Sequence, residues 1–175
     1  MEWIWIFVFY SFVGFLLEVG FAYLTGGRAD RKCLLLLPLC PVYGLGAGCI
    51  LWLAPLAGRN AILLFFLGGA AATAVEYALA VWYEKILGVS FWDYREIPGN
   101  IQGRVCLPFS AAWGLLSLAL VYWLHPRVTA WLGAVPVPVT LSAMVLVTAD
   151  LFVSSVMMKH TGDRSCLQWY RMSGA

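Results

Sequence analysis

The chain has 175 residues, of which 62% are hydrophobic and only 11% are charged, and its mean hydropathy is +0.84. Soluble domains carry about 25% charged residues, so this composition excludes an ordinary soluble domain and indicates an integral membrane protein. The formal net charge is +2 and the sequence contains no long basic run, so nucleic acid is not an expected partner.

Five apolar runs are long enough to cross a bilayer, because a helix spans the hydrocarbon core with roughly 20 residues. The sequence therefore predicts an all-α, polytopic bundle, a single transmembrane domain over residues 1–175. The first run follows Glu2 and is too long for the apolar part of a secretory signal, so we expect a retained span. In chain order the predicted spans are residues 3–24, 38–56, 60–83, 107–125 and 138–158, with a loop at 84–106 and a tail at 159–175.

The second run is the least regular of the five. Pro38 and Pro41 interrupt an apolar stretch that begins at Cys33. The sequence here predicts a kink or a short re-entrant turn. Non-helical backbone at membrane depth is tolerated only where protein or a wet cavity covers the freed backbone groups.

The basic residues predict the orientation, because short cytoplasmic loops carry an excess of Lys and Arg. Only Arg59 and Arg127 lie on one side of the predicted bundle. We therefore expect the N-terminus outside, and the 84–106 loop and the tail in the cytoplasm. The nine basic residues on the cytoplasmic side would be Arg28, Arg31, Lys32, Lys85, Arg95, Arg104, Lys159, Arg164 and Arg171.

Three acids lie within the predicted spans: Glu18 in the first, Glu76 in the third and Asp150 in the fifth. Each stands about two-thirds of the way along a helix that runs from outside to inside, so we expect similar depths toward the cytoplasm. A charge at a helix centre costs about 2.5–3.5 kcal/mol on insertion scales, and such acids usually face an interior or a cavity. Two interpretations remain open: a shared polar site, or structural acids that are hydrogen-bonded or paired with an arginine.

Polar residues are concentrated in one segment, residues 92–104 of the predicted cytoplasmic loop. Its Ile97-Pro98-Gly99-Asn100 sequence is typical of a turn, since Pro fixes φ and Gly and Asn tolerate left-handed backbone. Trp92 and Tyr94 are expected to anchor the loop at the level of the lipid headgroups. They would direct Asp93, Asn100 and Arg104 back toward the bundle.

Arg104 has two open interpretations. It either clamps the fold by pairing with Asp93, Glu84 or an intramembrane acid, or binds a phosphate or carboxylate ligand with its planar fork. No cofactor or metal site is predicted. The five cysteines include no CxxC pair, and the two histidines are expected on opposite sides of the membrane.

Several motifs within residues 8–127 resemble one family, the putative ABC-transporter type IV (CmpB-like) family of small bacterial membrane proteins. The resemblance implies a multi-pass protein of the bacterial cytoplasmic membrane with a role in transport. It carries over no catalytic or substrate-binding residue. The motifs are Phe12–Glu18, Pro41–Ala47, Glu84-x-x-x-Gly88, Trp92-Asp93-Tyr94, Pro98, Asn100, Gly103-Arg104-x-Cys106, Ser110-x-x-Trp113-Gly114 and His125-Pro126.

Three functions are consistent with these features. The preferred hypothesis is a transport component whose acids bind a cation, a proton or a cationic substrate, and whose loop gates the path or docks a partner. The expected partners are membrane lipids and one further protein. Because the sequence holds no Walker motif, that protein would be an ATPase, another membrane subunit or a second copy of the chain. The alternatives are a non-catalytic scaffold or regulatory subunit, and a lipid-directed enzyme with Asp93 or Glu84 as acid or base and Arg104 as phosphate clamp. The candidate site residues are Glu18, Glu76, Glu84, Asp93, Asn100, Arg104 and Asp150.

Overall fold

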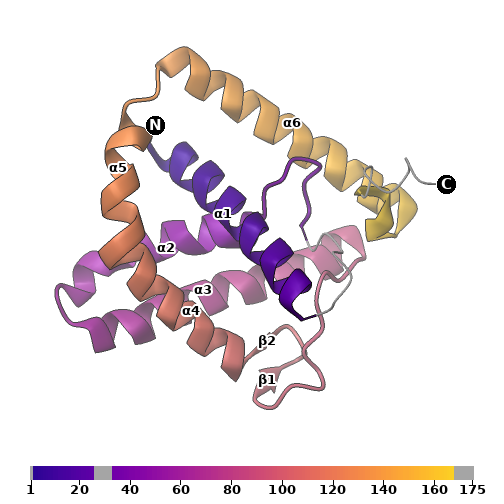
Figure 1. Cartoon of the computed structure of the whole chain (residues 1–175). Helices are drawn as coiled ribbons and strands as arrows, with labels where there is room; N and C mark the ends of the chain where they lie inside the picture. The colour runs from indigo at the N-terminus through magenta and orange to yellow at the C-terminus, as the bar shows by residue number, and fades with distance from the viewer. Residues whose placement is uncertain (1, 26–32, 168–175) are drawn as a thin grey trace.

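The computed structural model describes residues 2–25 and 33–167 and is almost entirely helical (Figure 1). Two π-helical turns, η1 (Tyr83–Leu87) and η2 (Leu120–Leu124), extend α3 and join α4 to α5. A two-stranded antiparallel hairpin, β1 (Asn100–Ile101) and β2 (Val105–Cys106), lies in the loop before α4. The helices are α1 (Glu2–Leu24), α2 (Pro41–Ala57), α3 (Ala61–Trp82), α4 (Leu107–Ala119), α5 (His125–Gly133), α6 (Val137–Thr161) and the short 3-10 turn η3 (Arg164–Leu167).

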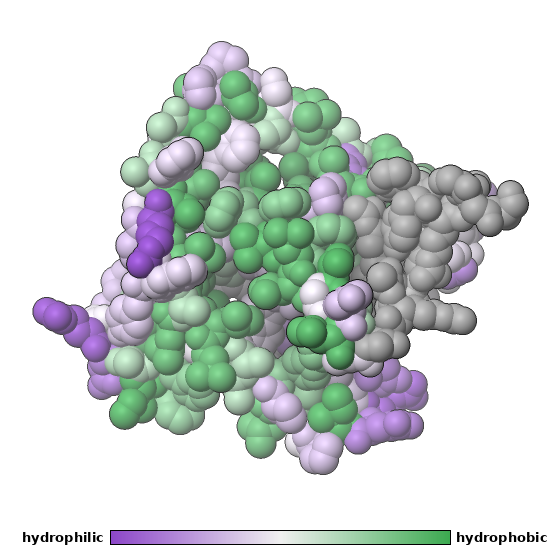
Figure 2. Space-filling view, in the orientation of Figure 1, coloured by the Kyte–Doolittle hydropathy of each residue, from purple (hydrophilic) through white to green (hydrophobic). Residues whose placement is uncertain are grey.

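Among the described residues, four continuous helical stretches are long and apolar enough to cross a membrane, and α2 is a shorter apolar helix beside them. This architecture confirms the predicted all-α, polytopic bundle. Figure 2 shows hydrophobic side chains over most of the visible face and hydrophilic ones gathered at its edges, as expected of a surface that meets lipid. The four stretches are Glu2–Leu24, Ala61–Leu87, Leu107–Gly133 and Val137–Thr161.

The third of these stretches, Leu107–Gly133, is longer than the fourth predicted span. The expected end at residue 125 is wrong, because the helix continues through Pro126 to Gly133. Proline usually breaks a helix because it lacks an N–H and clashes with the preceding turn. Here Pro126 follows the π-turn η2, in which the backbone ladder has already changed register, and it occupies the first turn of α5.

The second predicted span begins later than expected. Cys40 is extended, with φ −109° and ψ 97°, and α2 starts at Pro41 rather than at residue 38. The residue before a proline is pushed away from the helical region, which explains this boundary. The preceding residues 33–40 form an irregular segment, shown in Figure 1 as the non-helical trace between α1 and α6.

Small residues bring the helices together. A Cβ on Gly14 of α1 would lie 2.2 Å from the Tyr43 ring, and one on Gly68 of α3 would lie 2.3 Å from the Ser117 side chain. Close approach at small residues is a main source of helix association in lipid. The buried core between α1, α2, α3, α4 and α5 includes Ile6, Tyr10, Val42, Ala47, Ile50, Ala72, Trp113, Leu120 and Leu132.

The 88–106 loop and the end of α6 lie at the same end of the bundle. Val89 and Phe91 pack with Leu34, Met158 and Leu167 in a second buried cluster. This shared end agrees with the predicted cytoplasmic side. The inside–outside orientation itself stays a prediction, and Arg28, Arg31, Lys32 and Arg171 lie outside the described residues.

Candidate functional site

A cavity of about 430 Å³ lies between α1, the start of α2, α3, α4 and the loop. Glu18 and Glu76 both line it, so two of the three intramembrane acids meet in one place. Most of the remaining wall is aromatic or aliphatic. Its aromatic residues are Phe21, Tyr43, Trp92, Tyr94, Phe109 and Trp113.

Glu76 lies deepest, with 5% of its surface exposed. The Trp113 indole N–H donates to its Oε2 at 2.9 Å, and the Tyr94 hydroxyl donates to its Oε1 at 3.0 Å. Local sequence makes this possible: a Cβ on Gly69 would stand only 3.4 Å from the backbone of Gly114, so α3 and α4 approach closely and Trp113 reaches the acid. Both carboxylate oxygens of Glu76 therefore accept a hydrogen bond from a neutral group.

Glu18 on α1 is half-buried and faces the same cavity. The Tyr43 hydroxyl donates to its Oε1 at 2.8 Å. The Tyr43 ring also packs against Trp113, with ring centroids 4.9 Å apart. A chain of contacts thus links Glu18 to Glu76 through two aromatic side chains of α2 and α4.

Neither cavity acid has a cationic partner within the described part of the chain. The ion pairs among those residues both involve the loop, Arg95 with Asp93 and Arg104 with Glu84. None of the arginines in the described part of the chain pairs with Glu18 or Glu76. Within the described residues, the side-chain hydrogen bonds that these two acids accept come from Tyr and Trp donors.

Asp150 does not line this cavity. Its carboxylate accepts hydrogen bonds from the backbone N–H groups of Leu36 at 2.9 Å and Leu37 at 2.8 Å, and from the Ser154 hydroxyl at 2.8 Å. These contacts satisfy backbone donors that the irregular segment 33–40 leaves free of helical bonding. The structure thus brings Glu18 and Glu76 to one cavity, while Asp150 contacts the segment that leads into α2.

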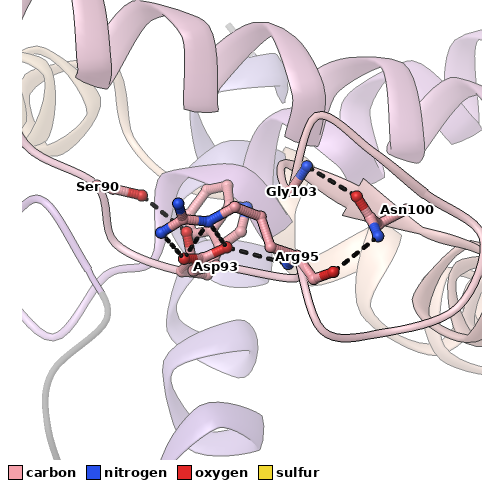
Figure 3. Close-up of polar contacts among 6 residues, drawn as sticks. Ser90, Asp93, Arg95, Asn100 and Gly103 are labelled. Atoms are coloured by element: carbon pink, nitrogen blue, oxygen red, sulfur yellow. Dashed lines mark hydrogen bonds and ion pairs between the residues drawn. The ribbon is translucent and has the colours of Figure 1, made fainter.

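The loop folds over one side of the cavity, and Asn100 holds its shape (Figure 3). The Asn100 amide donates to the carbonyls of Arg95 at 3.1 Å and Ile97 at 2.9 Å, and its oxygen accepts from the Gly103 N–H at 3.1 Å. The Tyr94 N–H also donates to the Gly103 carbonyl at 2.8 Å. Asn100 therefore stabilises the predicted turn and does not point into the cavity.

Two ion pairs fix the polar side of the loop. Arg95 forms an ion pair with Asp93, in which the Arg95 Nη2 lies 2.5 Å from the Asp93 Oδ2. The hydrogen bonds from Arg95 lower the pKa of the exposed Asp93 carboxyl. Arg104 pairs with Glu84 of η1 at 2.6 Å, and the Trp92 indole donates to the Arg104 carbonyl at 2.8 Å. Arg104 is therefore positioned as a clamp between the loop and the end of α3, one of the two roles expected for it.

A second, more open cavity of about 760 Å³ lies at the loop. Its lining includes Glu84, Asp93, Arg95 and Arg104. The lipid-directed enzyme hypothesis requires a pocket with Asp93 and Arg104, and this cavity contains them. Each of these charged groups already has an ion-pair partner, however. That arrangement favours a structural role, because a general base must be available to the proton it accepts.

Sequence reasoning did not identify the aromatic donors of the site. Tyr94 is expected at the headgroup level but turns inward to Glu76, and Tyr43 and Trp113 are known from the sequence only as family motif residues. Burial and the neighbouring Glu76 carboxylate raise the pKa of Tyr94, so its hydroxyl keeps its proton and donates. The sequence signal that could have pointed to these donors is that each of them lies in one of the family motifs.

The model of the family described as putative ABC-transporter type IV matches residues 5–159, which is most of the chain. No curated protein and no solved structure matches it. The chain therefore belongs to the putative ABC-transporter type IV family.

Proposed function

We propose that the protein is a transport component of the bacterial cytoplasmic membrane, with Glu18 and Glu76 as its polar binding site. The observation that carries this proposal is the cavity of about 430 Å³ in which both carboxylates meet without a cationic partner in the described part of the chain. The family supports a role in transport, since its description names a transporter type.

Acids without a cationic partner at membrane depth carry an energetic cost. A charged group inside a membrane helix is costly unless it faces an interior, pairs or contacts water, and such groups mark substrate and ion pathways. Glu76 is almost fully buried, and the donors around it are neutral. A positively charged solute or a proton entering the cavity would remove this cost, and its release would restore it.

The loop is suited to gate the cavity. Trp92 and Tyr94 are loop residues that also form part of the cavity wall, so moving the loop would open that wall. The ion pair of Arg104 with Glu84 ties the loop to η1. On the predicted orientation this gate faces the cytoplasm. Asp93 and Asn100 would keep the gate in shape rather than bind the solute.

A partner is part of the proposal, because the sequence contains no Walker motif for ATP hydrolysis. The family supports association with an ATPase or another membrane subunit. We propose that the partner docks at the second cavity, whose charged lining residues are Glu84, Asp93, Arg95 and Arg104. A second copy of the chain is the alternative partner, and a non-catalytic scaffold is the alternative function.

The test compares solute pools in cells by mass spectrometry, so the substrate need not be known. Cells without the protein are complemented with the wild type, with Glu76→Gln, or with Glu96→Gln as control. Glu96 is exposed and does not line the cavity, so its variant removes the same charge elsewhere. We expect at least one solute pool to change on deletion, to return with wild type and Glu96→Gln, and not to return with Glu76→Gln. Identical pools in all four strains, with normal membrane levels of each variant, would refute a transport role.

A further inference from the structure

We infer that the cavity of Glu18 and Glu76 binds an organic cation, an ammonium group with apolar substituents, inside a cage of aromatic rings. The inference deepens the proposed function and rests on it, since that function makes this cavity the binding site. It names a class of ligand that the proposed function leaves open among protons, metal ions and larger cations.

The aromatic wall is the first observation. Tyr43 packs against Trp113 with ring centroids 4.9 Å apart and an interplanar angle of 50°, and Tyr94 stacks on Phe109 at 4.9 Å and 22°. These rings come from α2, α4 and the loop, so they surround the cavity from different sides. The face of an aromatic ring attracts a cation within about 6 Å of its centroid, and cages of several rings are a known way to bind quaternary ammonium groups.

The sign of the charge is the second observation. Among the described residues, those that line the cavity include Glu18 and Glu76 but no Lys, Arg or His. The hydrogen bonds that the two carboxylates accept come from Tyr and Trp side chains, which orient them without adding positive charge. An anionic ligand would therefore meet two acids and no cation. A positively charged ligand would find both acids already oriented.

A metal ion fits this cavity poorly. Calcium takes about 6–8 oxygen ligands, and magnesium requires near-octahedral oxygen coordination. The acids here supply two carboxylates, each already engaged by a donor, and most of the wall is carbon. The described residues contain no group of three or more His, Cys, Asp or Glu that could hold a metal. An apolar wall stabilises the substituents of an organic ammonium, which a bare metal ion lacks.

The size of the cavity agrees with a small organic molecule. Its volume of about 430 Å³ lies within the range of about 300–1,000 Å³ that is typical of small-molecule pockets. Such pockets are mostly apolar with a few placed polar groups, which describes two carboxylates among aromatic and aliphatic side chains. An ammonium group with one ring or several short chains would fill it.

The experiment measures binding of phenyltrimethylammonium to the purified full-length protein in lipid nanodiscs, by equilibrium dialysis. Two matched probes accompany it: tert-butylbenzene, which has the same shape with carbon in place of the charged nitrogen, and benzenesulfonate, which is an anion. Empty nanodiscs correct for partition into lipid. We expect saturable binding of phenyltrimethylammonium only, with no competition from equimolar NaCl or MgCl₂.

Variants separate the charge from the cage. We expect Glu76→Gln to weaken phenyltrimethylammonium binding at least about tenfold, because one charge near a cation in a water-poor site is lost. Trp113→Leu, which removes a ring, should weaken it by about tenfold or more, while Tyr94→Phe keeps the ring and should weaken it less. Glu96→Gln should bind like the wild type. Glu18 is half-buried, so Glu18→Gln supplies the charge test if Glu76→Gln fails to fold.

The outcomes distinguish the ligand class from the proposed function. Equal binding of phenyltrimethylammonium and tert-butylbenzene, or unchanged binding in both Glu18→Gln and Glu76→Gln, would overturn the organic-cation assignment. If that happens while solute pools in cells still depend on Glu76, transport survives with another class of solute. If phenyltrimethylammonium binds as expected but no solute pool changes, the cation site stands and the transport role fails.

Discussion

Replacing Asp150 tests whether this acid anchors the irregular segment 33–40. Its carboxylate accepts three hydrogen bonds, from the N–H groups of Leu36 and Leu37 and from the hydroxyl of Ser154. In Asp150→Asn the best side-chain orientation keeps the amide oxygen on the Leu36 side. The amide NH₂ then faces the N–H of Leu37, so one backbone donor loses its acceptor.

The magnitude follows from that single lost partner. A hydrogen bond to a charged group contributes about 1.5–3 kcal/mol, and a buried donor left unsatisfied costs about 1–3 kcal/mol. We therefore expect Asp150→Asn to destabilise the segment by about 2 kcal/mol. Asp150→Ala removes the carboxylate from both backbone donors, but the Leu36 N–H keeps the Ser154 hydroxyl oxygen at 3.2 Å, so this variant should cost more than Asp150→Asn but less than twice as much. Ser154→Ala keeps the carboxylate and should cost about 0.6 kcal/mol, the average for a side-chain hydrogen bond measured inside a membrane protein.

The assay is alkylation of Cys33 and Cys40, the two thiols at the ends of this segment, both 2% exposed. If alkylation requires local opening, its rate reports the free energy of that opening. A loss of about 2 kcal/mol should raise the rate about 30-fold, and about 0.6 kcal/mol should raise it about threefold. Peptide mass spectrometry separates these thiols from the other three cysteines, and Cys49 in α2 serves as an internal reference.

Two results would refute this reasoning. If Asp150→Asn leaves the alkylation of Cys33 and Cys40 unchanged, the hydrogen bonds do not hold the segment. If Cys49 becomes reactive to the same extent, the whole bundle has been loosened and Asp150 has no local role.

Three further substitutions test the packing and the loop. In a thermal unfolding assay, Gly68→Ala should destabilise the fold by about 1–3 kcal/mol, because the added Cβ would lie 2.3 Å from the Ser117 side chain of α4. The control Gly48→Ala, whose added Cβ would have nothing within 4 Å, should be neutral or slightly stabilising. Gly103→Ala should increase proteolysis of the loop, because φ is +72° and the new Cβ would lie 2.6 Å from the side chain of Arg95; loop cleavage at the wild-type rate would contradict this. Arg104→Ala should lower the unfolding temperature slightly by breaking the pair with Glu84, and high salt should shrink the difference; a difference that does not depend on salt would show that packing, not charge, is the cause.

Much of the fold follows from the sequence because the bilayer imposes it. Apolar run length predicts spanning helices, and the paired prolines at 38 and 41 predicted the irregular entry to α2. The end of α4 was not predictable in this way. Pro126 is a helix breaker in water-soluble proteins, and only the π-turn before it, which has no sequence signature, lets the helix continue.

The candidate site was only partly predictable. Depth along a helix can be counted in the sequence, so Glu18 and Glu76 could be expected at a common level. Their rotation about the helix axis could not, because tilt and rotation are set by packing against neighbouring helices. For the same reason, nothing in the sequence indicated that Asp150 would accept from backbone N–H groups, or that the Tyr94 hydroxyl would donate to Glu76.

Asp150 and the two cavity acids have different surroundings, and the fold connects them. Asp150 accepts hydrogen bonds from the N–H groups of Leu36 and Leu37. The segment 33–40 then leads directly into α2, which begins at Pro41. The position of that first turn determines where Tyr43 stands, and Tyr43 both donates to Glu18 and forms part of the aromatic wall. A structural acid in α6 therefore positions a side chain of the cavity without touching it. Replacing Asp150 should therefore weaken cation binding and also increase the alkylation of Cys33 and Cys40. A variant that exposes these thiols without affecting cation binding would contradict this link.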